Sequence, residues 1–321
     1  MSGPSLMEQL SQLFPPKPRF TEKDLPDLDG KVYFITGANT GVGKELARML
    51  YSKNAKVYIA ARSEEKALRA IKDIKQASSG STGKLVFIQL DLADLSTIKD
   101  SAQTFLEQES QLHVLFNNAG GYEPQLGVNN VGTFLLTQLL TPLLAATAKR
   151  EPQPGTVRVV WVSSSAAEAP PSPTGGVPLD NLDYHKPLGW FPQYCISKAG
   201  NYLHGAEYAA RHGSSDGILS LSLNPGNLDS ELWRNQGFVA RTFLQWFILH
   251  PPVFGAYTEL YAGLSPEVTL EQHSGGWVVP WGRSMRIRKD LQEAARTKEE
   301  GGTGVAKGFW EWSERQVERY L

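Results

Sequence analysis

The chain has 321 residues, of which 41% are hydrophobic and 20% are charged, and its formal net charge is −1. A chain of this length can bury one large core, while a charge so close to zero gives no electrostatic basis for binding nucleic acid. Its single cysteine, Cys195, excludes an internal disulfide framework, and its scattered histidines predict no metal site.

Residues 1–29 are polar and contain prolines, which predicts an N-terminal arm with one short helix at 6–13. The arm lacks a basic stretch followed by a long apolar run, so we expect no cleaved signal peptide and a cytoplasmic protein. From residue 30 to residue 282, apolar runs of strand length alternate with segments of helical period. The predicted strands are 32–36, 56–61, 84–90, 112–117, 157–162, 218–223 and 277–280, and the predicted helices are 44–51, 64–77, 94–109, 128–148 and 193–211.

This alternation predicts an α/β fold with a single doubly wound parallel sheet and helices on both of its faces. Residues 283–321 follow as a C-terminal tail that we expect to dock on this domain. The longest apolar-rich stretch that we identify, 243–254, is too short to span a bilayer and holds two adjacent prolines. We therefore predict no transmembrane segment, and peripheral association with a membrane stays open as an alternative.

A glycine-rich turn joins the first predicted strand to its helix, where residues 36–43 read TGANTGVG. Such a turn lets the backbone approach a pyrophosphate, and the start of the helix supplies unpaired N–H groups and partial positive charge. The pattern predicts a dinucleotide site. Its candidate residues are Gly37, Asn39, Thr40, Gly41, Val42 and Gly43.

The second predicted strand ends in Ala60-Ala61-Arg62-Ser63. A carboxylate at this point would accept hydrogen bonds from the ribose hydroxyls of NAD, whereas Arg62 can pair with a phosphate. Lys44, directly after the glycine-rich turn, could assist. The sequence therefore favours NADP(H) over NAD(H), with ordinary surface cations as the alternative interpretation of Arg62 and Lys44.

Tyr194 and Lys198 lie four residues apart in a predicted helix, so their side chains project from one face. A free tyrosine titrates near ~10 and is a poor proton shuttle at neutral pH. A nearby ammonium stabilises the phenolate and lowers the tyrosine pKa. The pair is therefore a candidate for acid/base catalysis.

With these motifs in order, residues 30–280 resemble the classical short-chain dehydrogenase/reductase family, whose fold is Rossmann-type. Further matches are Asp91-Leu92, the NNAG of 117–120, Asn129, the serines of 163–165, and Pro225-Gly226. Within the family the chain is similar to the retinol-dehydrogenase-like and WW-domain-oxidoreductase-like branch, particularly to fungal members. That likeness rests on FPPKPRFTEKDLPDLDGK (14–31), the Ala-Arg-Ser of 61–63 and YAGLSPE (261–267).

The resemblance implies that Tyr194, Lys198, Ser164 and Asn129 are catalytic, with Ser163 and Ser165 as alternatives to Ser164. It assigns further residues to the cofactor, which are Lys44, Arg62, Asp91, Leu92, Asn118, Ala119, Gly120, Tyr194, Lys198, Pro225 and Gly226. Residues 227–252 would form a substrate lid. The implied activity is an NADP(H)-dependent interconversion of a carbonyl and an alcohol on a hydrophobic small molecule, in a protein that can be a homo-oligomer.

One departure from the family concerns the connection between Asn118 and Asn129, which spans only ten residues. In relatives this connection is longer, and its missing part lies beside the cofactor. A shortened connection would widen the pocket, displace Asn129 or impair folding, and an artefact of the gene model would look the same. Two alternatives therefore stay open: a cofactor-binding regulatory homologue that has lost turnover, and a non-redox lyase or cyclase on the same fold.

Overall fold

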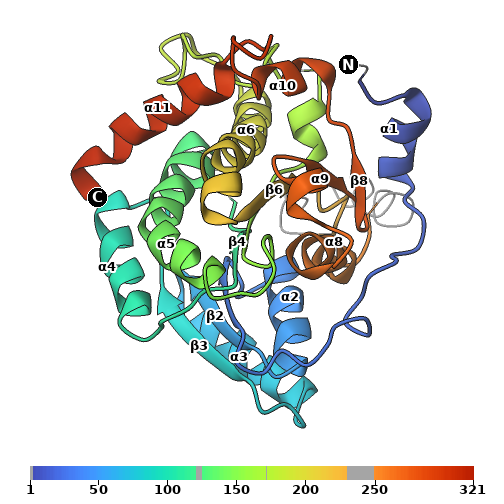
Figure 1. Ribbon diagram of the computed structural model, residues 1–321, viewed down its shortest axis with the longest axis vertical. Coiled ribbons are helices and arrows are strands. Elements are labelled where there is room, and N and C mark those ends of the chain that lie inside the picture. The colour runs from blue at the N-terminus through green and yellow to red at the C-terminus, as the bar shows by residue number, and fades with distance from the viewer. Residues whose placement is uncertain (1–2, 121–124, 171, 230–248) are drawn as a thin grey trace.

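The computed structural model describes residues 3–120, 125–170, 172–229 and 249–321 (Figure 1). Eight strands form one sheet in the order β3-β2-β1-β4-β5-β6-β7-β8. All neighbouring strands from β3 to β7 are parallel, and β8 pairs antiparallel with β7. The strands are β1 Val32–Thr36, β2 Lys56–Ala61, β3 Lys84–Gln89, β4 Val114–Asn117, β5 Arg158–Val162, β6 Leu219–Leu223, β7 Trp277–Val279 and β8 Arg283–Met285.

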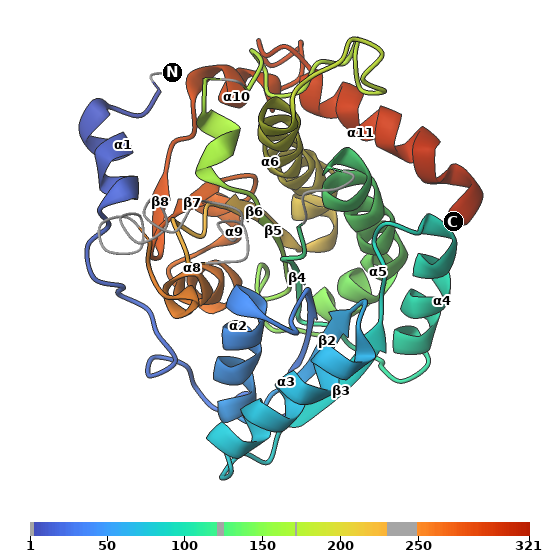
Figure 2. The ribbon, with the colours of Figure 1, turned by 180° about the vertical axis from the view of Figure 1, so that it is seen from behind.

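The predicted doubly wound sheet is confirmed, and helices cover both of its faces (Figures 1 and 2). On one face, apolar residues of three helices pack against inward side chains such as Ile35 of β1 and Val160 of β5. These helices are α2 Gly41–Ser52, α3 Glu64–Ala77 and α8 Pro252–Leu264. Alternate strand residues, such as Phe34 and Val159, face the other side. There the sheet is covered by α4 Leu95–Leu106, α5 Thr133–Ala148 and α6 Trp190–Asp216.

Shorter helices complete the described chain. They are α1 Leu6–Leu13, the π-helix η1 Gly127–Gly132, the 3-10 helix η2 Ser165–Glu168, α9 Leu270–His273, α10 Lys289–Ala294, α11 Val305–Val317 and the 3-10 helix η4 Glu318–Tyr320. Strand β8 extends the sheet past the domain boundary predicted at residue 282. Most of the predicted lid, 230–248, and residues 121–124 of the short connection lie outside the described residues.

One helix of the fold is long and strongly apolar. By length and composition alone, the continuous helix over Gly127–Ala148 could cross a membrane, and it is longer than the apolar stretch 243–254. Within the described fold, however, more than half of this helix is buried. Phe134, Leu140 and Leu144 on it pack into the core between sheet and helices. Its apolar character is accounted for by burial on several sides.

The C-terminal helix α11 lies against α6, and the C-terminus ends beside α4 (Figure 1). Trp310 on α11 is 1% exposed, and its ring centroid lies 4.7 Å from that of Phe134 on α5. The guanidinium of Arg211 lies 4.8 Å from the Trp310 ring, at a distance that allows a cation–π contact. The tail is therefore part of the packed domain.

Replacing Trp310 with alanine should lower the free energy of unfolding by about 3–5 kcal/mol, because it removes a large buried ring. Urea denaturation at neutral pH measures this change. Arg315→Ala, on the exposed side of the same helix, is the control and should change the free energy by no more than about 0.5 kcal/mol. Equal stability of the wild type and Trp310→Ala would show that α11 is not part of the cooperative unit.

Candidate active site

The side chains singled out in the sequence gather at the carboxyl ends of the parallel strands. Strands β1 and β4 are neighbours in the sheet, although they are far apart in the chain. The crossovers from β1 and β4 leave toward opposite faces, so their loops open a crevice at this edge. The glycine-rich turn follows β1, and the Asn118-Ala119-Gly120 segment follows β4.

These two loops are joined by direct hydrogen bonds. The Asn118 side chain donates to the carbonyl oxygen of Thr36 at 2.8 Å, and the Ala119 N–H donates to the Thr36 hydroxyl at 2.8 Å. Gly37 has φ +69°, and a Cβ atom on Gly43 would lie only 2.6 Å from Asn118 Nδ2. A side chain is disfavoured at Gly37 and Gly43, so the backbone there stays open to a ligand at the start of α2. This geometry fits a pyrophosphate.

The two predicted phosphate-binding cations behave differently. Arg62 follows β2, is exposed and has no ion-pair partner among the described residues. Lys44 instead forms an ion pair with Asp73 of α3, with 2.6 Å between Nζ and Oδ2. This ammonium lowers the pKa of the Asp73 carboxyl. Arg62 is therefore the cation available for a ligand phosphate, and Lys44 is already paired.

Asp91 and Leu92 follow β3 near the same edge. The Asp91 carboxylate accepts a hydrogen bond from the Ala93 N–H at 2.9 Å, which orders this turn. Leu92 is buried in the core between the sheet and α4. The side chain of Leu92 is therefore part of the packing, and only its backbone could face an adenine ring.

Tyr194 and Lys198 lie on one face of α6, as the spacing predicts. The Lys198 ammonium lies 5.7 Å from the centre of the Tyr194 ring and donates to the Val162 carbonyl oxygen at 3.3 Å. Lys198 is only 5% exposed. Burial disfavours its charged form and lowers the pKa of Lys198 to about 8. The tyrosine thus lies beside an ammonium that titrates close to neutral pH.

A buried acid that the sequence analysis missed acts on this lysine. Glu259 lies on α8, is 0% exposed, and neither of its carboxyl oxygens has a hydrogen-bond partner among the described residues. Burial raises the pKa of Glu259 to about 8, and the charge of Lys198 opposes that rise. Gly255 and Gly263 lie four residues before and after Glu259, on the same face of α8. Gly255 faces Val42 of the glycine-rich turn, and Gly263 faces Phe116 of β4. Glu259 therefore points toward the sheet near the glycine-rich turn.

Asn129 is held at the site by the π-helix η1. Its amide donates to the Ser197 hydroxyl at 2.9 Å, and that hydroxyl donates to the Tyr194 carbonyl oxygen at 2.9 Å. A Cβ atom on Gly120 would lie 3.0 Å from Lys198 Nζ and 3.4 Å from Asn129 Oδ1, so these two polar atoms are neighbours. Asn129 therefore lies beside α6, close to Lys198. Single turns of π-helix are frequent at functional sites.

The three consecutive serines after β5 have different surroundings. The buried Ser163 hydroxyl donates its proton to the Lys198 carbonyl oxygen of α6 at 2.6 Å, so this proton is not available to a substrate. The half-buried Ser164 oxygen accepts from the Ala166 N–H at 3.2 Å, so its proton remains free to reach a ligand. Ser165 is exposed. Ser163 is thereby disfavoured as the substrate-binding hydroxyl.

Pro225-Gly226 follows β6, where the sequence analysis expected a nicotinamide neighbour. Asn224 accepts a hydrogen bond from the Gly226 N–H at 3.0 Å. Gly226 has φ +96° and packs against Pro280 and the indole of Trp281. The structure therefore brings the ends of β1, β4, β5 and β6 and the Tyr194 face of α6 to one edge, while Arg62 and Asp91 flank it on β2 and β3.

Comparison with known proteins identifies the family. The family model for short chain dehydrogenase matches residues 31–175. A short-chain dehydrogenase/reductase of Phomopsis amygdali is 53% identical over 331 residues, covering 99% of this chain and 98% of the relative. Another, from Neocamarosporium betae, is 49% identical, covering 97% of this chain and 93% of the relative. The finer assignment to the retinol-dehydrogenase-like branch stays a prediction.

Solved structures agree on the fold. An uncharacterised protein of Mycobacterium paratuberculosis matches with a TM-score of 0.67 at 26% identity, over 93% of this chain and 97% of that protein. A 3-ketoacyl-(acyl-carrier-protein) reductase of Brucella melitensis, solved with NADH, matches with a TM-score of 0.59 at 20% identity, over 78% of this chain and 96% of that protein. The chain belongs to the short-chain dehydrogenase/reductase family of oxidoreductases and is similar to its fungal members.

Proposed function

We propose that the protein is an NADP(H)-dependent oxidoreductase that interconverts a carbonyl and an alcohol on a hydrophobic small molecule. The observation that carries this proposal is the buried Lys198 ammonium beside the Tyr194 ring, at the same edge as the glycine-rich turn. The family membership supports the reaction class. When bound, the nicotinamide would supply or accept the hydride.

In the proposed reaction, the Tyr194 hydroxyl donates its proton to the substrate oxygen during reduction and removes it during oxidation. Lys198 stabilises the phenolate that remains on Tyr194 and holds the nicotinamide ribose. Ser164 donates a hydrogen bond to the substrate oxygen and orients it. Asn129 lies close enough to Lys198 for one water to bridge them, which would connect the tyrosine to solvent protons.

The intact arrangement speaks against the regulatory alternative. Ribose binding alone would account for Lys198, but not for its position 5.7 Å from the Tyr194 ring, and perturbed groups of this kind concentrate where catalysis occurs. The short connection is the feature that favours this alternative, and against it stands the hydrogen bond of Asn129 to Ser197, which places Asn129 beside α6. We therefore favour an active enzyme.

For the cofactor, we propose that Arg62 binds the ribose phosphate that distinguishes NADPH from NADH. Its exposure and lack of an ion-pair partner among the described residues support this role, whereas Lys44 is paired with Asp73. The surroundings of the glycine-rich turn support pyrophosphate binding for either nucleotide. The phosphate at Arg62 would then decide the preference.

Arg62→Ala should raise the dissociation constant of NADPH about 10- to 100-fold, since it removes a charge-assisted hydrogen bond. The affinity for NADH should stay within about twofold of the wild type, because NADH lacks the contacted phosphate. Nucleotide fluorescence titration measures both constants. Arg69→Ala, on the exposed face of α3, is the control. Equal weakening of both nucleotides would contradict the role of Arg62.

Tyr194→Phe tests the proposed acid. With NADPH and trans-decalone, a bulky apolar ketone, the turnover number should fall about 100- to 10,000-fold, because the proton donor is lost. The affinity for NADPH should stay within about twofold. The matched control is Tyr202→Phe, two turns further along α6 and packed against the Trp277 ring. Retention of turnover by Tyr194→Phe would overturn the mechanism.

Glu259→Gln tests the buried charge behind Lys198. The charge of Glu259 raises the pKa of Lys198, so its loss should lower that pKa. In the wild type, the ammonium is lost as the pH rises through about 8, and the turnover number should fall there. In Glu259→Gln the fall should begin at lower pH, with Glu45→Gln as the control. A uniform loss of turnover at every pH would indicate a structural role only.

A further inference from the structure

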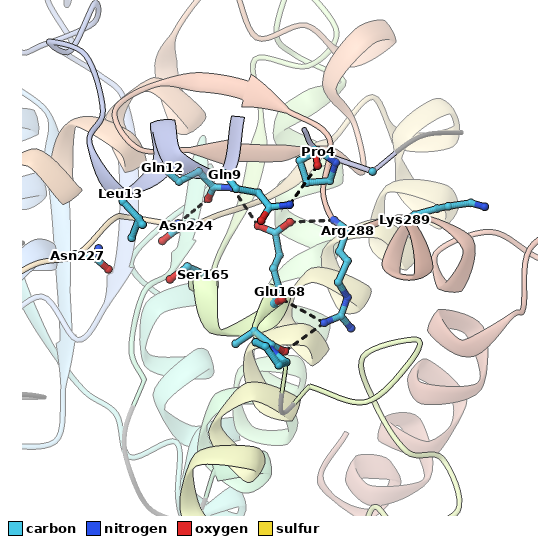
Figure 3. A pocket seen from close by; sticks show the side chains of 13 residues that line it. Pro4, Gln9, Gln12, Leu13, Ser165, Glu168, Asn224, Asn227, Arg288 and Lys289 are labelled. Carbon is cyan, nitrogen blue, oxygen red and sulfur yellow. Dashed lines mark hydrogen bonds between the residues drawn. The ribbon is translucent and has the colours of Figure 1, made fainter. Parts of the chain in front are cut away.

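A cavity of about 560 Å³ lies between the N-terminal helix α1, the segment around η2 and the start of α10 (Figure 3). This volume falls within the range of roughly 300–1,000 Å³ that is usual for small-molecule sites. Pro4, Leu13 and Ala169 contribute apolar surface. The neutral polar lining includes Gln9, Gln12, Ser165, Asn224 and Asn227, and the charged lining residues are Glu168, Arg288 and Lys289.

Helix α1 forms one wall of this cavity and is firmly attached to the domain. The Arg283 guanidinium of β8 donates to the Ser11 hydroxyl at 2.9 Å and to the Ser11 carbonyl oxygen at 2.7 Å. Gln12, which is 7% exposed, donates to the Glu168 carboxylate at 3.2 Å and accepts from the Asn224 amide at 3.0 Å. Figure 3 shows Gln12 lying between Asn224 and Glu168.

The cavity borders the edge that holds the proposed reaction site, because three of its lining residues are next to assigned residues in the chain. Ser165 directly follows Ser164, and Asn224 and Asn227 enclose Pro225-Gly226. A molecule in the cavity would therefore have one end beside the residues to which we assign the carbonyl group. Its other end would face Glu168 and α1.

We propose that this cavity is the substrate pocket, that α1 shapes it, and that Glu168 binds a hydroxyl group of a bulky, largely apolar carbonyl compound. The proposal rests on the proposed oxidoreductase function and names the substrate class of the same site. The N-terminal arm is then a specificity element.

The choice of a hydroxyl group follows from the partners of Glu168. Its carboxylate accepts from the Gln12 amide and from the Arg288 N–H at 3.0 Å. A carboxylate offers about four acceptor positions, so room remains for a ligand donor. Both cations of the lining have carboxylate partners: the Arg288 guanidinium donates to Asp290 at 2.6 and 2.8 Å, and Lys289 Nζ lies 3.5 Å from Glu293. Glu168 would therefore disfavour an anionic ligand at this end of the cavity.

The test measures binding by calorimetry, using the full chain saturated with NADP⁺ so that no ketone is reduced. Three probes are compared: trans-decalone, a trans-decalone with a hydroxyl group on the distant ring, and one with a carboxylate there. The hydroxylated probe should bind about tenfold more tightly than the unsubstituted one, as expected for a hydrogen bond to a charged group. The carboxylate probe should bind most weakly.

Two variants of Glu168 separate its role from folding. Glu168→Leu should abolish the preference for the hydroxylated probe, and the isosteric Glu168→Gln should reduce it about threefold, since a neutral acceptor remains. Gln12→Ala should weaken both neutral probes, because α1 loses its link to Glu168. Met7→Ala, on the exposed side of α1, is the control and should change nothing.

Equal binding of all three probes, tightest binding of the carboxylate probe, or binding of none of them would overturn the assigned substrate class. Unchanged affinities in Gln12→Ala would overturn the role of α1. The affinity for NADP⁺, measured in a separate titration of the protein without any probe, reports on the proposed function. A protein that binds the hydroxylated probe but no nucleotide would contradict the function and leave the pocket assignment supported.

Discussion

The site depends on the contact between two loops at the carboxyl edge of the sheet. The turn after β1 and the Asn118 segment after β4 are joined through Thr36, and Gly43 lies so close to Asn118 that a side chain would separate them. The parallel pairing of β1 with β4 brings these loops together across about eighty residues of chain. The open backbone at the start of α2 follows from this contact.

A second constraint is the burial of charge at the same edge. Lys198 reaches the end of β5 from one face of the sheet, and Glu259 approaches from the helix on the other face. Each group, by itself, would be driven toward its neutral form by burial, and each opposes that tendency in the other. Perturbed groups of this kind concentrate where chemistry occurs, which is why a lysine in the core supports a reaction site more strongly than a lysine on a surface helix.

Much of the fold and of the candidate site could be predicted from the sequence, because strand-length apolar runs and motif residues are local signals. Tyr194 and Lys198 follow from helical spacing, and the glycine-rich turn follows from its position between a strand and a helix. Helix α8 was missed because it is buried on several sides and shows no clear apolar face. Glu259, Gln12 and the pairing of Lys44 with Asp73 were missed because their partners are distant in the chain, and a single sequence carries no local signal for such contacts.

Hydride transfer at this edge is tested most directly by following the transferred hydrogen from NADPH into the product. NADPH carrying deuterium in both hydrogen positions of the nicotinamide C4 would be incubated with the protein and hydroxylated trans-decalone, and the product would be analysed by mass spectrometry. We expect one deuterium on the carbon that was the ketone carbonyl, for each NADPH oxidised. A product without deuterium, or NADPH that binds and is never consumed, would contradict hydride transfer and favour a non-redox reaction.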